Sequence, residues 1–177
     1  LAGKTILITG AARRIGASLA LYLAKSGADI ILHHANSPEA AEQTAAEIRE
    51  NGRQAWVIRN DFTNPEAALK LIDQAWDLHP FDALINNAAI FEDVGWKETT
   101  VEVWKATMDI NLTAPFFLSQ QFSIKLDGKS GRIINILDWR GLRPGADHLA
   151  YTVSKGALVT LTQSLAQALA PNITVNG

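Results

Sequence analysis

The sequence predicts an α/β fold in which a doubly wound parallel sheet lies between two layers of helices (α/β/α). Short apolar segments with β-branched residues, typical of buried parallel strands, alternate with segments whose apolar residues recur at helical spacing. No repeat, linker or composition break interrupts this alternation over the 177 residues, a length that fits one domain. Right-handed crossovers between parallel strands place helices on both faces of the sheet.

Six segments are predicted to be strands because they are short, apolar and rich in Ile, Leu and Val. They are Thr5–Thr9, Ala28–His34, Gln54–Asn60, Ala83–Asn86, Gly131–Leu137 and Ile173–Val175. Ligands in such sheets bind at the carboxyl ends of the strands, so the residues that follow each strand are the first candidates for a site.

Five segments between the strands are predicted to be helices. The first begins at Arg13. The other four cover Pro38–Asn51, Pro65 to about His79, roughly Val101–Leu126, and Tyr151–Ala170. Ser37 and Asn64 each precede a Pro and a Glu, which supplies an N-cap, a Pro at the first helical position and an acidic first turn. Pro115 is expected to kink the long fourth helix.

Composition excludes several classes of protein. A net charge of −2 argues against nucleic acid or an anionic membrane as the main partner, and the absence of cysteine excludes disulfides and thiolate metal sites. No apolar run approaches the roughly 20 residues that span a bilayer, and the N-terminus has no signal-peptide pattern. We expect a soluble, cytoplasmic protein with a single domain (1–177) that binds no metal.

The stretch Lys4–Gly16 predicts a nucleotide site. A strand, a turn at Gly10 and the start of a helix together leave backbone N–H groups free where a phosphate can bind. An ordinary strand–turn–helix is the alternative. The candidate cofactor residues of this turn are Gly10, Arg13, Arg14, Ile15 and Gly16.

The spacing Thr-Gly-x-x-x-Arg-x-Gly resembles the TGxxxGxG fingerprint of the short-chain dehydrogenase/reductase family, which has a Rossmann-type fold. Arg14 stands where the fingerprint has its middle glycine, and this Arg resembles the pteridine reductase branch of the family. The resemblance covers the chain from Lys4 to Gly177. It also implies that the family continues beyond this point with a substrate loop, a helix and a last strand, so we expect the sequence to be partial.

The end of the second strand indicates which dinucleotide binds. NAD-selective sites usually carry an acidic residue there, whereas this chain has His34, Asn36 and Ser37. Arg14 and Ser37 suit a 2′-phosphate, so NADPH is expected. Because relatives often have a basic residue at the position of Asn36, the resemblance implies a weaker phosphate pocket here. The alternative is that the two histidines are a strand end and a surface residue.

Further cofactor residues follow from the resemblance. It implies that Asp61, with its neighbour Phe62, lies at the adenine and that Asn87 and Ala88 lie beside the cofactor ribose. Asp61 is equally suited to cap the turn before the next helix. An Asn pair is common in any turn, and this one is informative because it follows the fourth strand.

Tyr151 and Lys155 are the strongest catalytic candidates. At i and i+4 they lie on one helical face, so both heads reach one pocket. A nearby cation is expected to lower the Tyr pKa from its usual value near 10, which makes Tyr151 a general acid. The resemblance implies that Lys155 also binds the nicotinamide ribose, and that Asn111 is a catalytic Asn that holds a helix kink open and anchors a water.

Asp138 and Phe91 point to the substrate. Most family members have a Ser thirteen residues before the Tyr, whereas this chain has Asp138, as pteridine reductases do. The resemblance also implies that Phe91 stacks on a pterin. Packing is the alternative for Phe91, and ordering of the loop Arg140–Gly145 is the alternative for Asp138.

These residues together predict an NADPH-dependent reductase of a reduced pterin, such as a dihydropterin or dihydrofolate, in which Tyr151 and Asp138 supply the proton. The alternatives are a carbonyl reductase or alcohol dehydrogenase of the same fold, and a non-catalytic NADP-binding sensor. The resemblance implies a homo-oligomer, a dimer or tetramer, assembled through the fourth and fifth predicted helices. Their large apolar residues are Trp104, Met108, Phe116, Phe117, Leu161 and Leu165.

Overall fold

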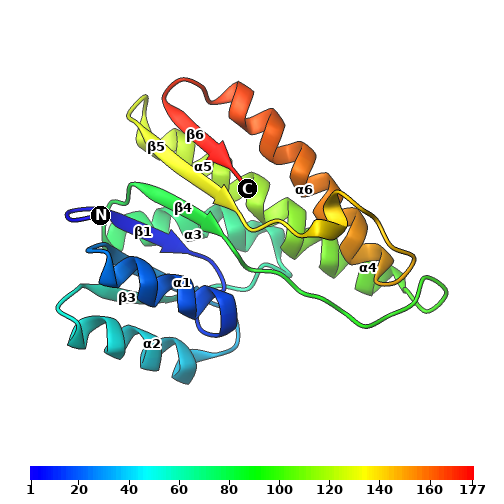
Figure 1. Cartoon of the computed structure of the whole chain (residues 1–177), viewed down its shortest axis with the longest axis horizontal. Coiled ribbons are helices and arrows are strands. Elements are labelled where there is room, and N and C mark those ends of the chain that lie inside the picture. Colours follow the sequence, from blue (N-terminus) through cyan, green and yellow to red (C-terminus); the bar gives the residue numbers. More distant parts are fainter.

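A computed structural model describes residues 1–177 and confirms the predicted α/β fold. Six parallel strands form one sheet in the order β3-β2-β1-β4-β5-β6 (Figure 1). They are β1 Thr5–Ile8, β2 Asp29–His34, β3 Ala55–Arg59, β4 Ala83–Asn86, β5 Gly131–Asn135 and β6 Ile173–Asn176. The order reverses between β1 and β4, and this is where open α/β sheets bind ligands.

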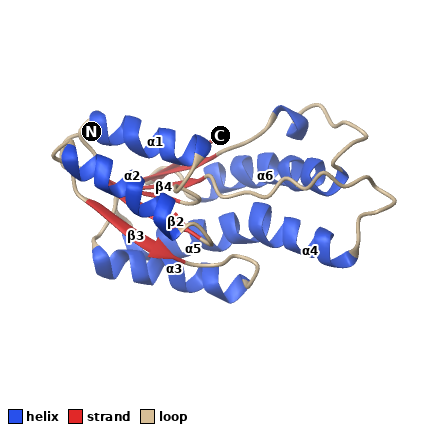
Figure 2. Ribbon diagram, turned by 90° about the horizontal axis from the view of Figure 1, so that it is seen from below, coloured by secondary structure: helices blue, strands red, loops and turns tan.

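The helices form layers on the two faces of the sheet (Figure 2). They are α1 Arg14–Lys25, α2 Pro38–Glu50, α3 Pro65–Leu78, α4 Val101–Met108, α5 Ala114–Leu126 and α6 Leu149–Ala168. Helices α1 and α2 cover one face, and α3, α5 and α6 cover the other. None of these helices is both long enough and apolar enough to cross a bilayer.

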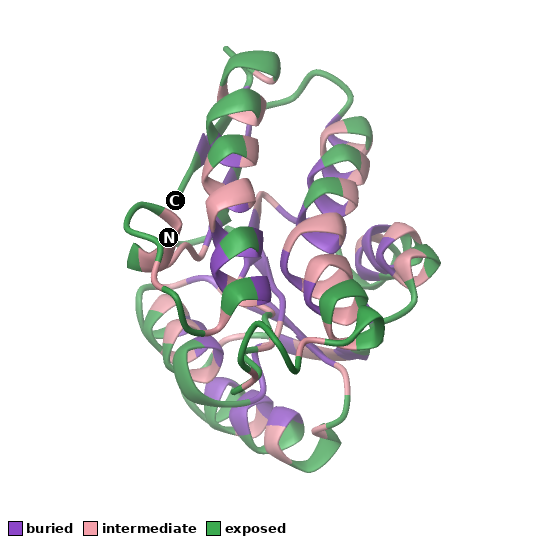
Figure 3. Ribbon diagram, turned by 90° about the vertical axis from the view of Figure 1, so that its right-hand side faces the viewer, coloured by how far each residue is buried: buried purple, intermediate pink, exposed green.

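Two apolar cores follow from this layering. Ile6 and Ile8 of β1 face the core beneath α1 and α2, whereas Leu7 between them faces the core beneath α3 and α5. Successive strand side chains point to opposite faces, so a strand buried on both sides is a continuous apolar run. Figure 3 shows the result, with buried residues gathered between the helices and exposed residues on the outer helical faces.

Coverage of both faces is complete only over part of the sheet. Along β5, buried residues alternate with the exposed residues Arg132 and Ile134. β6 shows the same alternation. No helix of residues 1–177 lies over this face of β5 and β6, so these two strands are exposed on one side.

The predicted long helix, Val101–Leu126, is divided where Pro115 was expected to kink it. A π-helical turn, Asp109–Thr113, separates α4 from α5, and Pro115 lies in the first turn of α5. Because proline has no N–H, the carbonyl of Asn111 loses its α-helical partner. The wider turn before the proline, rather than a kink at it, is the irregular feature.

Several boundaries differ from the predicted ones. Strand β5 ends at Asn135 rather than Leu137, and α6 covers Leu149–Ala168 rather than Tyr151–Ala170. Ser37 precedes α2, but its side chain makes no capping hydrogen bond, whereas Asn64 caps α3 by accepting from the Glu66 N–H. Ser37 Oγ therefore stays free.

Candidate active site

A cleft of about 510 Å³ lies at the carboxyl ends of the strands. It is lined by every predicted cofactor residue except Lys155, and by Phe91. The predicted residues along it are Gly10, Arg13, Arg14, Ile15, Gly16, His34, Asn36, Ser37, Asp61, Phe62, Asn87, Ala88, Phe91 and Tyr151. The sequence reasoning missed six others, which are Ala12, His33, Ala35, Ala89, Ile90 and Ile110.

The turn after β1 has the backbone geometry that its glycines allow. Gly10 adopts a left-handed φ of +63°, and a Cβ on Gly16 would overlap the carbonyl oxygen of Gly10. Arg14 also lies in the left-handed region, at φ +52°. This is where the fingerprint has a glycine, because a residue with a Cβ is strained there by roughly 1–3 kcal/mol. Arg14 carries this backbone strain in the folded chain.

Asn87, which follows β4, holds the same turn through its side chain. Its Nδ2 donates to the Thr9 carbonyl (2.9 Å) and to the Gly10 carbonyl (3.0 Å). The Thr9 hydroxyl in turn accepts from the backbone N–H groups of Asn87 and Ala88, at 3.0 Å each. These bonds tie the ends of β1 and β4 together. Asn86 points into the core, where its Nδ2 donates to Asn135 Oδ1 (2.8 Å).

Positive charge collects at one end of the cleft. Arg13 and Arg14 are exposed, and neither side chain makes an ion pair or a hydrogen bond within the chain. Asp61 is the only carboxylate among the residues that line the cleft. The exposed Asn36 and the free Ser37 hydroxyl lie at the same cleft. This end therefore presents cations and a hydroxyl to a ligand.

The two histidines at the end of β2 are buried, which excludes the alternative that one is a surface residue. His33 is 2% exposed and His34 is 3% exposed. His34 Nδ1 accepts weakly from the Ser37 N–H (3.4 Å), and burial lowers the pKa of His34. His33 was not among the predicted site residues, although it borders the cleft.

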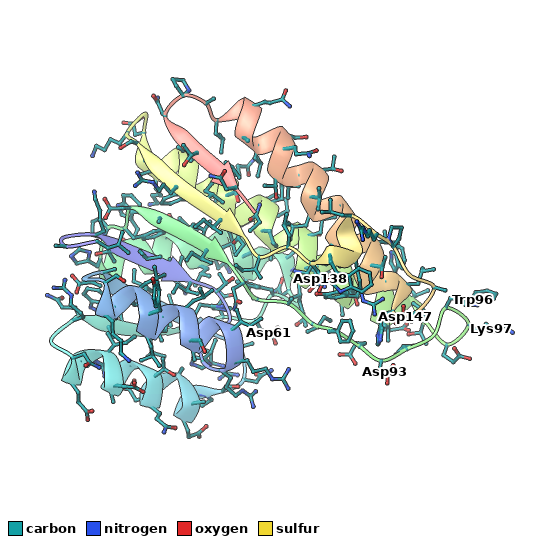
Figure 4. The ribbon with its side chains drawn as sticks, viewed as in Figure 1. Asp61, Asp93, Trp96, Lys97, Asp138 and Asp147 are labelled. Atoms are coloured by element: carbon teal, nitrogen blue, oxygen red, sulfur yellow. The ribbon has the colours of Figure 1, made fainter.

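Asp61 shapes the turn before α3 and keeps one carboxylate oxygen unpaired. One oxygen, Oδ1, accepts from the N–H of Thr63 (3.0 Å) and from its hydroxyl (2.9 Å), so it shapes the turn before α3. The other oxygen has no partner in the chain, and the residue is exposed at the cleft, where Figure 4 labels it. Asp61 can order the turn and still accept a hydrogen bond from a ligand.

Tyr151 and Asp138 are directly joined. The Tyr151 hydroxyl donates to Asp138 Oδ2 (3.1 Å), and Asp138 Oδ1 accepts from the Arg140 N–H (2.8 Å). Asp138 therefore orders the loop that follows β5 and also contacts Tyr151. Lys155 Nζ donates to the Ile136 carbonyl (2.7 Å) and lies 5.6 Å from the Tyr151 ring centroid.

The surroundings of Tyr151 shift its pKa opposite to the expected direction. Burial first, and then the hydrogen bond and negative charge of Asp138, raise the pKa of Tyr151, so the expected lowering is wrong for the groups that the chain supplies. Burial lowers the pKa of Lys155 to about 8. Tyr151 thus keeps its proton at neutral pH and holds it against the Asp138 carboxylate.

Asn111 clamps the loop after β4. Its Oδ1 accepts from the Ile90 N–H (2.9 Å), and its Nδ2 donates to the Ile90 carbonyl (3.0 Å) and to Ser154 Oγ (3.1 Å). Ser154 is in α6, one residue before Lys155. The π-helical turn thus links the segment that carries Phe91 to the helix that carries Tyr151.

Phe91 lies beside Tyr151, with 53% of its surface exposed. Its ring stacks on His148 at 4.1 Å and meets the Tyr151 ring edge-on at 4.6 Å. His148 Nδ1 donates to the Glu92 carbonyl (2.9 Å), which holds the Phe91 loop against the start of α6. The sequence reasoning missed His148, and no local pattern in the sequence indicated it.

Comparison with known proteins identifies the family. The family model described as short chain dehydrogenase matches residues 4–177. The 3-oxoacyl-[acyl-carrier-protein] reductase of Synechocystis sp. is 35% identical over 99% of this chain and 72% of its own length.

Two solved structures share the fold. A short chain dehydrogenase from Burkholderia cenocepacia in complex with NADP is 37% identical, with a TM-score of 0.94 over 99% of this chain and 73% of its own. FolM alternative dihydrofolate reductase 1 from Brucella canis, complexed with NADP, is 32% identical, with a TM-score of 0.90 over 98% of this chain and 71% of its own. The protein therefore belongs to the short-chain dehydrogenase family of oxidoreductases.

Proposed function

We propose that the protein is an NADPH-dependent reductase of a reduced pterin, a dihydropterin or dihydrofolate, with Tyr151 and Asp138 supplying the proton. The observation that carries this proposal is the 3.1 Å hydrogen bond between Tyr151 and Asp138, next to the exposed ring of Phe91. The similarity to a structure described as an alternative dihydrofolate reductase supports the substrate class.

The nucleotide end of the cleft fits NADPH. Gly10 and Gly16 let the turn pack closely against Ala88 and Asn87, and the backbone N–H groups at the start of α1 suit a pyrophosphate. Arg14 and Ser37 would hold the 2′-phosphate, and the free Asp61 oxygen would accept from the adenine amino group. Lys155, with Asn87 and Ala88, would lie at the nicotinamide ribose. Bound there, NADPH would supply a hydride to the substrate carbon.

The proton comes from the chain itself. Reduction of a C=N bond needs a proton at nitrogen, and its donor must lie within hydrogen-bond reach. Tyr151 stays protonated at neutral pH because burial and Asp138 raise its pKa. Asp138 accepts the hydrogen bond from that hydroxyl (3.1 Å), so the carboxyl and the hydroxyl would act together on one proton. Arg140 and Lys155 supply the nearby positive charge.

Phe91 supports a flat substrate. About half of the residue's surface is exposed, and its ring packs against His148 and Tyr151. A ring held by neighbours loses little entropy when a planar heterocycle stacks on it, and such stacking contributes about 0.5–1.5 kcal/mol. Because the ring contacts His148 and Tyr151, Phe91 also contributes to packing.

A carbonyl reductase is the second candidate, favoured by the similarity to the 3-oxoacyl-[acyl-carrier-protein] reductase. Asp138 distinguishes the two candidates. A Ser hydroxyl at this position would orient a carbonyl oxygen, whereas a carboxyl suits a ring nitrogen with its proton. A non-catalytic NADP sensor would not require the Tyr151–Asp138 contact.

The test is a screen of NADPH oxidation, followed by absorbance, against dihydrobiopterin, dihydrofolate and a panel of small ketones and 3-oxoacyl thioesters. We expect turnover with the dihydropterins and little with the carbonyl compounds. Turnover with carbonyls alone would replace the leading proposal by the second candidate. Binding of NADPH without turnover of any substrate would favour the sensor.

Assembly through α4, α5 and α6 belongs to the same proposal. Trp104 and Phe116 remain more than one-third exposed, as do Val101 and Ile124. Phe117 and Leu165 instead pack against the core beneath α3 and α5, so they contribute less to a contact surface than the sequence suggested. We expect sedimentation at micromolar concentration to show a dimer or tetramer, and a monomer would contradict this assembly.

A further inference from the structure

We propose that His33 is a positioning residue for the cofactor: through both ring nitrogens it fixes the turn after β1 against the end of β3 and so sets the position of the phosphate-binding N–H groups. The inference rests on the proposed binding of NADPH, and it concerns a residue that contacts neither the reacting atoms nor the substrate end of the cleft.

His33 joins three segments that meet at the nucleotide end of the cleft. Its Nδ1 accepts a hydrogen bond from the Gly10 N–H (3.1 Å), and its Nε2 donates to the Asn60 carbonyl (2.9 Å). Its ring stacks on the ring of Phe62 at 4.4 Å, with the two planes 16° apart. Gly10 belongs to the glycine turn, and Asn60 and Phe62 flank Asp61. One side chain therefore sets the spacing between the proposed pyrophosphate and adenine sites.

The two partners allow only one form of the imidazole. The Gly10 N–H can only donate and the Asn60 carbonyl can only accept, so Nδ1 must carry the lone pair and Nε2 the proton. A second proton on Nδ1 would face the Gly10 N–H. Burial agrees with this assignment because it lowers the pKa of His33 to about 4, with His34 adding to the lowering, while the Asn60 hydrogen bond and Asp61 act against it. The ring is therefore neutral over the physiological range.

The hydrogen bond from the Gly10 N–H to His33 Nδ1 restricts the conformation of the turn. The Gly10 N–H points at His33 and not into the cleft, so the ring takes up one donor of the turn and fixes the plane of that peptide. A phosphate that binds the remaining donors depends on this orientation. Loss of the acceptor leaves the Gly10 N–H to find another partner, and the turn must move to provide one. An unpaired buried N–H costs roughly 1–3 kcal/mol, which is about 5-fold to 150-fold in an equilibrium.

The test measures NADP⁺ affinity by calorimetry for three variants. His33→Phe keeps the volume and the Phe62 stack but has no acceptor, and His33→Gln places its amide at the position of Nε2 and also leaves Gly10 without a partner. His33→Asn places an oxygen at the position of Nδ1 and restores the acceptor. His79→Phe is the matched control, because His79 also stacks on an aromatic ring, Trp56 (4.9 Å), and precedes β4, at the amino ends of the strands and away from the cleft.

We expect His33→Phe and His33→Gln to raise the Kd for NADP⁺ about tenfold or more, His33→Asn to stay within about threefold of the parent, and His79→Phe to match it. At saturating NADPH, kcat should stay within about twofold, so the loss appears in KM for NADPH. If His33→Phe does not fold, the comparison of His33→Gln with His33→Asn is sufficient to test the inference. Unchanged affinity in His33→Gln, or equal losses in Gln and Asn, would overturn the inference. Failure of the parent protein to bind NADP⁺ would overturn the proposed function as well.

Discussion

The two ends of the cleft are built differently. At the nucleotide end, backbone and amide groups fix one another: Gly16 has no room for a Cβ, Asn87 donates to two carbonyls of the turn, and His33 bridges two loops. Near Tyr151 the side chains are large and exposed instead: Phe91 in the cleft is 53% exposed, and Trp139 and Leu142 in the loop after Asp138 are 62% and 72% exposed. Trp96, at 65%, lies far out on the loop that precedes α4 (Figure 4).

This difference assigns different tasks to the two ends. Groups held by backbone contacts recognise a constant feature, the phosphates of a dinucleotide, and tolerate almost no change. Side chains on loops recognise a variable feature and can change without disturbing the sheet. Substitutions at the nucleotide end should therefore alter cofactor binding and folding together, whereas substitutions at the substrate end should alter substrate use alone.

The largest effect is expected at Gly16. In Gly16→Ala the new Cβ would overlap the Gly10 carbonyl oxygen and lie 2.7 Å from Asn87 Nδ2, so the turn must open. We expect the free energy of unfolding to fall by about 3 kcal/mol and NADP⁺ affinity to fall about a hundredfold. Urea unfolding and calorimetry measure the two quantities. Gly156→Ala is the control, because its nearest contact is 3.8 Å away and alanine should stabilise α6 by about 0.5–1 kcal/mol.

The acid stability of the nucleotide end depends on His33. The pKa of His33 is lowered from 6.5 to about 4 in the folded chain, so between these values the unfolded chain binds a proton that the folded chain does not. Stability is full above pH 6.5 and falls as the pH falls, by up to about 3 kcal/mol at pH 4. Urea unfolding should show this loss in the parent, and a smaller one in His33→Gln. Equal losses would mean that His33 titrates normally.

Two substitutions of Arg14 should separate the effect of its charge on cofactor binding from the effect of its backbone strain on stability. Its exposed guanidinium has no partner in the chain, and its φ is +52°. We expect Arg14→Ala to weaken NADPH binding by about 1.5–3 kcal/mol and NADH binding little, since only NADPH carries the 2′-phosphate. Arg14→Gly should lose the same affinity while gaining about 1 kcal/mol of stability. Equal losses of affinity for NADPH and NADH would contradict the proposed contact between Arg14 and the 2′-phosphate.

Phe91 should show the smallest effect, confined to the substrate. In Phe91→Leu the stacking surface is lost. The binding free energy of a dihydropterin should weaken by about 0.5–1.5 kcal/mol, so its KM should rise about 2-fold to 13-fold. NADP⁺ affinity should not change, and the free energy of unfolding should change little, because the ring is half exposed and only its contacts with His148 and Tyr151 are lost. A fall in NADP⁺ affinity would show that the two ends of the cleft are coupled.

Much of the nucleotide end could be predicted from the sequence, because its signals are local. The strand, turn and helix of Lys4–Gly16 lie within thirteen residues, and the missing acid after β2 is a property of one short segment. His33 could not be assigned in this way. A strand buried on both faces shows no alternation, so the sequence does not reveal which polar side chain meets the turn.

The substrate end depends on contacts between distant residues. The π-helical turn lies where Asn111 meets both Ile90 and Ser154, which are 21 and 43 residues away in the chain. Burial, and then the orientation of Asp138 thirteen residues earlier, raise the pKa of Tyr151, whereas the sequence predicted that the nearby cation Lys155 would lower it. The sequence indicated that Asn111, Asp138 and Tyr151 belong to the site, but it did not indicate which groups their side chains contact.

The central claim is that Asp138 and Tyr151 act as one acid on a reduced pterin, and Asp138→Asn tests it most directly. The amide keeps the shape and can still accept from the Arg140 N–H, so fold and NADPH affinity should match the parent protein. Dihydropterin turnover, measured as kcat at saturating NADPH, should fall about a hundredfold, and Asp138→Ser should gain some carbonyl reduction. Dihydropterin reduction by Asp138→Asn at the parent rate would show that the carboxyl takes no part in the chemistry.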